Sequence, residues 1–174
     1  MDASTVVAAC ATVIALASLA VSVYEARASR RHSRLSVRPL LELRAGFRPG
    51  AKAGLQLVNA GLGPALITGS VLTLDGVAVG EFDEANVNLI REGLQTVWPA
   101  AVTLGGRSIL ATDYDRFLLG VDGYDAEVHA EFWHLLRCRL GLELRYESLY
   151  GGETYMATWA PQPGDRRCGE PGRG

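Results

Sequence analysis

The amino-terminal run of the chain, residues 3–24, carries no charge and is followed by a cluster of arginines. As a helix this run would extend roughly 33 Å, which exceeds a bilayer core of about 30 Å. The pattern therefore predicts a transmembrane helix over residues 1–25. Because Lys and Arg beside a membrane helix tend to stay in the cytoplasm, the arginines predict an inner-membrane, single-pass protein whose N-terminus faces out and whose C-terminal domain is cytoplasmic.

The rest of the chain contains short segments in which apolar and polar residues alternate, as they do in half-buried strands. The clearest is residues 139–147, where leucines and Tyr146 alternate with arginines and glutamates. Asp75-Gly76 indicates a hairpin turn between two such segments. Further strands or extended pieces are predicted at 37–47, 55–59, 65–74, 77–79, 97–98, 102–104, 108–111 and 154–159.

Two segments indicate helices. Asp83 is a suitable N-cap for a helix that continues to about Leu94, with Val87 and Ile90 on its apolar face. Between residues 113 and 138 the pattern is ambiguous, because positions 128, 132, 135 and 136 fit one helix face whereas 128, 130 and 132 also alternate. We expect a helix there because of the length of the segment, with a strand as the alternative.

Several short strands separated by turn residues indicate a mainly β protein. We expect an immunoglobulin-like β-sandwich of about seven strands with one or two inserted helices, preceded by the N-terminal transmembrane helix. The predicted divisions are the transmembrane helix over 1–25, a basic juxtamembrane linker over 26–38, the sandwich over 39–160 and a disordered tail, rich in Gly and Pro, over 161–174.

The charges are unevenly distributed, although the net charge is only −2. Residues 26–52 hold eight basic residues against Glu42, whereas residues 53–165 hold fifteen carboxylates against six arginines. An acidic domain argues against nucleic acid as a partner. The three cysteines, Cys10, Cys138 and Cys168, show no framework of pairs, which suits a reducing cytoplasm. Arginine makes up 16 of the 17 basic residues, which favours a GC-rich bacterial genome.

Two sets of residues near the N-terminus predict contacts. The arginines would lie at anionic lipid headgroups, and they are Arg27, Arg30, Arg31, Arg34 and Arg38. A stripe of small residues would let two helices approach closely, and it consists of Ala8, Ala11, Ala15, Ser18 and Ser22, with Ser4 before it. Because about half of this segment is small, chance also produces such a stripe, so a homo-oligomer is one of two interpretations.

Residues 57–66, LVNAGLGPAL, admit two interpretations. The piece from Gly61 to Ala65 matches the start of a dinucleotide-binding fingerprint, but Leu66 replaces the third glycine and no helix pattern follows. We favour a tight corner between two strands. In that corner Asn59, Gly61 and Gly63 can adopt positive φ at little cost, and Pro64 fixes the direction of exit.

The motif N-x-G-x-G-P-A at residues 59–65 is accompanied by R-P-x-L at 38–41 and by Y-x-S-x-Y-G at 146–151. Together with the N-terminal hydrophobic helix, these motifs resemble those of a loose group of uncharacterised bacterial, single-pass, membrane-anchored β-sandwich proteins. The resemblance covers residues 5–158. It implies the fold and the anchoring, and it brings no activity with it.

No candidate for catalysis, cofactor binding or metal binding outweighs a structural interpretation. His134 and Cys138 share a helix face, but a metal site needs three or four ligands. The carboxylates between Asp113 and Glu127 lack the spacing of a calcium loop. Ser148 does not lie in a G-x-S-x-G elbow. We therefore predict no enzyme, no cofactor and no metal.

The expected function is that of a non-enzymatic, membrane-tethered cytoplasmic β-sandwich that binds or positions another protein. Sheet edges and acidic loops would be its contact surface. The alternatives are an oligomerising membrane effector and a small ligand-binding or hydrolytic enzyme. The expected partners are the membrane and an unidentified protein, with a second copy of the chain as a further candidate.

Overall fold

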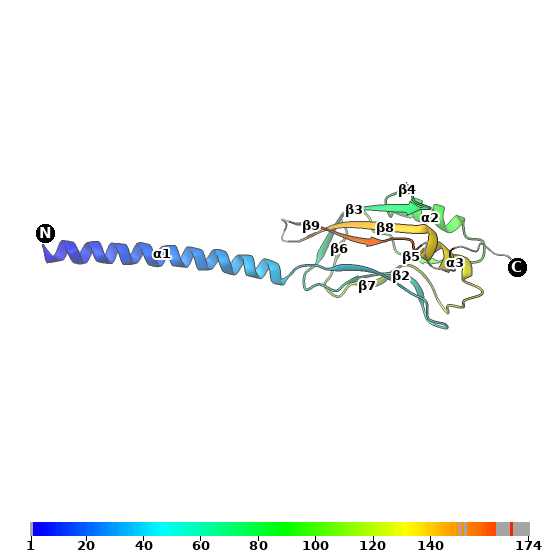
Figure 1. The fold of residues 1–174 in the computed structure, drawn as a ribbon, viewed down its shortest axis with the longest axis horizontal. Coiled ribbons are helices and arrows are strands. Elements are labelled where there is room, and N and C mark those ends of the chain that lie inside the picture. The colour runs from blue at the N-terminus through cyan, green and yellow to red at the C-terminus, as the bar shows by residue number, and fades with distance from the viewer. Residues whose placement is uncertain (1, 150, 152, 163–167, 169–174) are drawn as a thin grey trace. The chain divides into compact units, whose positions relative to one another are not determined.

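A computed structural model describes residues 2–149, 151, 153–162 and 168 of the 174-residue chain. Within the first helix, the side chains of residues 5, 6, 8–10, 28 and 30–36 lie outside the described part. The chain divides into two compact units, Met1–Val37 and Arg38–Gly174 (Figure 1).

The first unit is a single long helix, α1 (Ala3–Ser36). Its interior is rich in alanine, the residue with the highest helix propensity, and contains neither Gly nor Pro. The helix ends three residues before Pro39, as expected because a proline disfavours helical backbone at the residue that precedes it. The predicted linker over 26–38 is therefore helical as far as Ser36.

No helix in the described part of the chain is long and apolar enough to cross a membrane. The predicted transmembrane helix over 1–25 and the predicted inner-membrane location are therefore wrong. Residues 11–27 of α1, whose side chains are described without a gap, contain five alanines and two serines and include Glu25 and Arg27. This stretch is less apolar than the run of roughly 20 apolar residues that a span requires.

The second unit is a β-sandwich of two antiparallel sheets, so the mainly β expectation is confirmed. The first sheet has the order β1-β2-β7-β5 and consists of β1 (Leu41–Gly46), β2 (Ala53–Asn59), β7 (Asp115–Val121) and β5 (Ala100–Ala101). The second has the order β4-β3-β8-β9, with β6 also paired to β3; it consists of β4 (Val77–Gly80), β3 (Ala65–Leu74), β8 (Leu140–Ser148), β9 (Thr154–Trp159) and β6 (Ile109–Leu110).

The two sheets lie face to face over one hydrophobic core (Figure 1). β8 shows how the sequence builds this core, because Leu142, Leu144 and Tyr146 are buried while Arg145 between them is exposed. This is the alternation expected of a strand with one face toward the core. The strand order brings the first strand and the last strand to the same flank of the sandwich.

The hairpin between β3 and β4 turns at Asp75-Gly76, as the sequence predicted. Both residues have positive φ, 53° and 80°, which is the geometry of a type I′ turn. The backbone N–H of Asp75 donates to the carbonyl of Arg139, and the Arg139 side chain donates two hydrogen bonds back to the Asp75 carboxylate, at 2.8 and 2.6 Å. The turn is therefore fastened to the start of β8.

Two helical segments are inserted among the strands. The first, α2 (Glu84–Glu92), has the predicted N-cap, because the Asp83 carboxylate accepts from the backbone N–H of Asn86 at 2.8 Å. The second is α3 (Ala130–His134), which continues into a π-helix, η1 (Leu135–Arg139). The helix expected over 113–138 is thus confirmed only at its end, because residues 115–121 form strand β7.

A disulfide joins Cys138 of η1 to Cys168, with 5.5 Å between their Cα atoms. The expectation of unpaired cysteines suited to a reducing cytoplasm is therefore wrong for these two residues. They meet because the chain after β9 returns to η1. The indole N–H of Trp159 donates to the carbonyl of Leu136 at 2.8 Å. The backbone N–H of Gln162 donates to the carbonyl of Arg137 at 2.7 Å.

Candidate interaction surface

The predicted corner at residues 59–64 is a buried hydrogen-bond centre. Asn59 is 3% exposed, and its side-chain oxygen accepts from the backbone N–H groups of Leu40 and Gly61 at 3.2 and 3.1 Å. Its side-chain nitrogen donates to the carbonyls of Gly63 and Ala111, both at 2.9 Å. Asn59 therefore joins the start of β1, the corner and the segment after β6, which is a structural role.

The glycines of this corner act differently from the prediction. The described residues with positive φ are found elsewhere, so Asn59, Gly61 and Gly63 do not use the left-handed conformation that was open to them. Gly61 is required for a close approach instead. A Cβ at Gly61 would lie 2.3 Å from the nitrogen of Leu40 and 2.5 Å from the carbonyl oxygen of Arg38. Pro64 directly precedes β3, as expected of a residue that sets the exit.

The five arginines predicted to lie at a membrane surface do not form one described group. Arg27 is exposed on α1, and the side chains of Arg30, Arg31 and Arg34 lie outside the described residues. Arg38 belongs to the second unit, where its guanidinium lies over the ring of Tyr155, 4.3 Å from its centre. The sequence grouped Arg38 with the others by its spacing on a continued helix, although Pro39 already made helix unlikely at Arg38 itself, and α1 ends at Ser36.

The small-residue stripe of α1 is exposed where it is described. Ala11, Ala15, Ser18 and Ser22 are exposed, and the side chain of Ala8 lies outside the described residues. The Ser22 hydroxyl donates to the Ser18 carbonyl at 2.9 Å, within the helix itself. Self-association through this stripe stays a prediction, because the described side chains show a surface and no partner.

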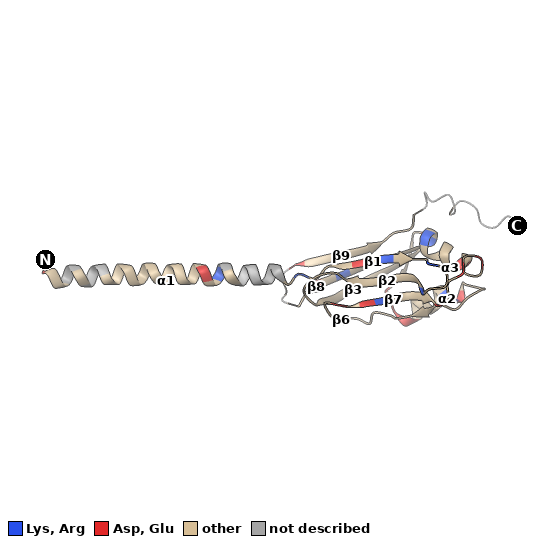
Figure 2. Ribbon diagram, turned by 90° about the horizontal axis from the view of Figure 1, so that it is seen from below, with Lys and Arg blue, Asp and Glu red and all other residues tan. Residues whose placement is uncertain are grey.

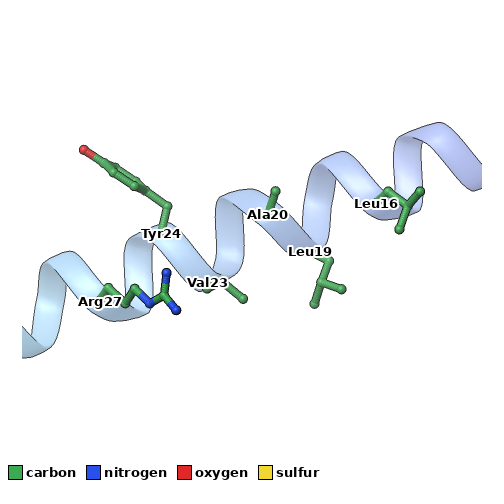
Figure 3. A pocket seen from close by; sticks show the side chains of 6 residues that line it. All are labelled: Leu16, Leu19, Ala20, Val23, Tyr24 and Arg27. Carbon is green, nitrogen blue, oxygen red and sulfur yellow. The ribbon is translucent and has the colours of Figure 1, made fainter.

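A shallow hollow on α1 is lined by side chains of this helix alone: Leu16, Leu19, Ala20, Val23, Tyr24 and Arg27. Figure 3 shows Leu19 and Val23 on one side of the helix, and the Tyr24 ring projecting from another side. Such a hollow between successive turns of an isolated helix is open to solvent. It provides no enclosed space for a small molecule.

Side chains of the types that can ligate metal ions have structural contacts in the sandwich. Cys138 is bonded to Cys168. His129 stacks on Tyr124 with 5.6 Å between ring centres. The Asp125 carboxylate accepts from the N–H groups of residues 127 and 128, which lowers the pKa of Asp125. In the described part of the chain, no group of three potential ligands is positioned to hold a metal ion.

Strand β9 is the feature that offers a surface to another chain. Its ladder with β8 runs without a bulge, from Thr154 opposite Glu147 to Trp159 opposite Leu142. No strand among the described residues pairs with its other side. The backbone N–H and C=O groups along that side form the row of donors and acceptors that an additional strand requires.

The side chains of β9 separate into a core face and an outward face. Ala157 and Trp159 are buried in the sandwich. Thr154, Met156 and Thr158 are exposed, and Met156 is 61% exposed. The strand TYMATW contains no charge, no glycine and no proline.

The other free edges of the two sheets are either short or charged. β4, β5 and β6 have four, two and two residues. β1 carries an ion pair between Glu42 and Arg44. Its first backbone N–H, on Leu41, donates to the Tyr146 hydroxyl oxygen at 3.2 Å. Figure 2 shows both charges on β1 and none along β9. Since charges and shortness are what protect natural sheet edges, β9 is the unprotected edge among the described strands.

The beginning of β9 is held firmly in place. The Tyr155 ring contacts the guanidinium of Arg38 on one side and lies 5.5 Å from the Tyr146 ring, centre to centre. The Tyr155 hydroxyl donates to the Glu153 carboxylate, and this hydrogen bond raises the pKa of Tyr155. The edge is therefore ordered before any partner binds, which lowers the entropic cost of binding.

Sequence reasoning predicted strand 154–159 and named sheet edges in general as the contact surface, but it did not single out this one. The signal was present in the composition, because the segment is the last of the strands and has no charged residue. What the sequence could not show is which strands end a sheet.

No protein-family model matches this chain, and no curated protein matches it. The resemblance of its turn motifs to those of uncharacterised β-sandwich proteins stays a prediction. The chain is described by its own features: a long helix and a separate β-sandwich with one unprotected edge.

Proposed function

We propose that the sandwich is a non-enzymatic protein-interaction module whose contact surface is the free edge of β9. The single observation that carries this proposal is the one-sided pairing of β9, a strand of six residues without charge, proline or bulge. Edges of this kind join other chains by strand addition unless they are blocked.

The chemistry of the edge defines what it would bind. An added strand gains hydrogen bonds from the β9 backbone irrespective of its sequence, and the outward side chains then provide selectivity. Thr154, Met156 and Thr158 present two hydroxyls beside one flexible apolar side chain. This edge suits an extended segment with small polar and apolar side chains, and the charges beside it belong to β8, where exposed Arg145 lies opposite Met156.

Photocrosslinking provides the test. A benzophenone amino acid is introduced at Met156 on β9 or at Val77 on β4, which is 69% exposed and serves as the matched control. Irradiation of cells that express each full-length variant is expected to yield discrete adducts at position 156 and none at 77. Adding Thr158→Lys should remove the adducts, because an ammonium on the edge disfavours strand addition.

Two results would reject the proposal. Equal adducts at both positions would mean non-specific contact. The absence of adducts at position 156, in a variant whose thermal unfolding matches that of the wild type, would mean that the edge has no partner.

A further inference from the structure

We infer that the partner of β9 is a second copy of this chain, whose own β9 pairs with it antiparallel to form one sheet across both sandwiches. This inference rests on the proposed function and adds to it the identity of the partner. Closed two-fold contacts in which the same surface occurs on both sides are the commonest form of oligomer.

The absence of charge on β9 removes the main obstacle to pairing with its own copy. Two identical strands that pair antiparallel bring like charges together wherever a charged residue lies near the centre, and like charges directly opposite are destabilising. β9 carries no charged residue from Thr154 to Trp159. In contrast, the neighbouring edge β1 carries Glu42 and Arg44.

The position beside β9 is open within its own sheet. β1 lies next to β9 on the same flank of the sandwich, but among the described strands it forms a ladder only with β2. A second β9 paired to that side would extend the sheet that contains β4, β3, β8 and β9, on the flank where β1 also lies. The combined sheet would have the order β4-β3-β8-β9-β9-β8-β3-β4.

The two faces of β9 restrict the register. Residues directly opposite each other in an antiparallel pair have their side chains on the same face of the sheet. Thr154, Met156 and Thr158 face outward, and Ala157 and Trp159 face the core. The two-fold axis must therefore pass through a residue rather than between two residues, because a register shifted by one would oppose core-facing and outward-facing side chains.

Met156 is the residue that fits this axis best. With Met156 opposite its own copy, Thr154 lies opposite Thr158, a pairing of hydroxyl side chains that stabilises sheets. Tyr155 then lies opposite Ala157, which places a large residue beside a small one. Centring on Ala157 would instead place Tyr155 opposite Trp159, where two large side chains compete for the same space.

Cysteine crosslinking tests this register directly. In the full chain with Cys10→Ala, Met156→Cys is expected to form a disulfide-linked dimer when a diazene oxidant removes two electrons and two protons from the paired thiols. Directly opposed residues have Cα atoms about 4.5–5.5 Å apart, which a disulfide can bridge. Thr154→Cys alone should not crosslink, because its copy would lie roughly 13 Å away along the strand. Mixing Thr154→Cys with Thr158→Cys chains should restore the crosslink.

Sedimentation velocity of the full chain provides an independent readout. We expect a concentration-dependent dimer, and we expect Met156→Lys to raise its dissociation constant by about tenfold or more, because two ammonium groups would meet on the axis. Val77→Lys places the same charge on the exposed β4 and should leave the constant unchanged. Thermal unfolding of both variants should match that of the wild type.

The outcomes separate this inference from the proposed function. Crosslinks at position 156 composed of two copies, together with a dimer weakened by Met156→Lys alone, support both. Adducts at position 156 that contain only other proteins, on a chain that sediments as a monomer, support the proposed function and overturn the self-pairing. A dimer that Met156→Lys does not weaken, or equal crosslinking of Thr154→Cys and Met156→Cys, also overturns the self-pairing.

Discussion

The guanidinium carbon of Arg38 lies 4.3 Å from the centre of the Tyr155 ring, and this contact joins the residue just before the first strands to the last strand of the chain. Both β1 and β9 begin within a few residues of it. The flank of the sandwich is thus fastened at the point where the edge of β9 becomes available.

Asn59→Ala should lower the free energy of unfolding by about 2–4 kcal/mol, because it leaves two backbone N–H groups and two carbonyls without their buried partner. Urea denaturation measures the change. Gln56→Ala on the same strand removes an exposed amide and should cost well under about 1 kcal/mol. Equal losses for the two variants would contradict the role assigned to Asn59.

Gly61→Ala should destabilise the sandwich by about 1–3 kcal/mol, because its Cβ would meet the backbone of residues 38–40 at 2.3–2.6 Å. Gly46→Ala on β1 is the matched control, since a Cβ there meets nothing within 4 Å. It should be neutral or slightly stabilising, because alanine restricts the unfolded chain more than glycine does. Thermal unfolding of both variants provides the comparison, and a neutral Gly61→Ala would show that the incoming segment can shift.

Reduction of the Cys138–Cys168 bond should lower the free energy of unfolding by about 3–4 kcal/mol, because the bond closes a loop between residues 30 apart. Denaturation with and without a dithiol reductant measures this. The double variant Cys138→Ser with Cys168→Ser should reproduce the reduced protein and should not respond to the reductant. If the free energy of unfolding of the wild type were the same with and without the reductant, the two cysteines would not be bonded.

The ion pair between Asp75 and Arg139 should make the free energy of unfolding depend on pH. The hydrogen bonds from Arg139 lower the pKa of Asp75 below its usual value. The contribution is therefore complete above the usual aspartate pKa of about 4 and is lost as the pH falls through the lower, folded-state pKa. Because both side chains are about half exposed, we expect less than about 1 kcal/mol.

Asp75→Asn isolates this effect, since asparagine also adopts the positive φ of the turn. The variant should be less stable than the wild type at neutral pH, and the difference should shrink as the pH falls below about 4. A difference that stays constant across this range would assign the cost to the turn rather than to the charge.

The elements that the sequence predicted well are those with strong local signals. Asp75-Gly76 specifies its turn by backbone preference alone, and Asp83 specifies the start of α2 by its cap. β8 follows from the alternation of apolar and charged residues between Leu142 and Glu147. In each of these cases, neighbours in the sequence suffice to determine the local structure.

β7 could not be recognised in this way. Its residues Leu118–Val121 are buried one after another, and the ladder with β2 shifts register between Leu55 and Gln56. A bulge of this kind breaks the period of two on which strand prediction depends. Strands β5 and β6, of two residues each, exist only because β7 and β3 lie beside them.

The disulfide and the free edge of β9 depend on tertiary structure. Cys138 and Cys168 are brought together by the return of the chain after Trp159. The position of β9 at the end of its sheet follows from the strand order, which no local pattern encodes. The uncharged run of α1 led to the wrong prediction of a transmembrane helix. A run without charge is not necessarily hydrophobic enough to cross a membrane.

The disulfide has a mechanical consequence. Tension applied between α1 and the end of the chain would enter the sandwich through β1 and leave it at Cys168, which is bonded to Cys138 ahead of β8. The disulfide would carry the force directly to Cys138. β8 and β9 lie between the two cysteines, so the covalent path of the force would bypass them. Cleaving the bridge would shift the load onto β9 itself, and stretching would then strip away the strand that we propose as the contact surface.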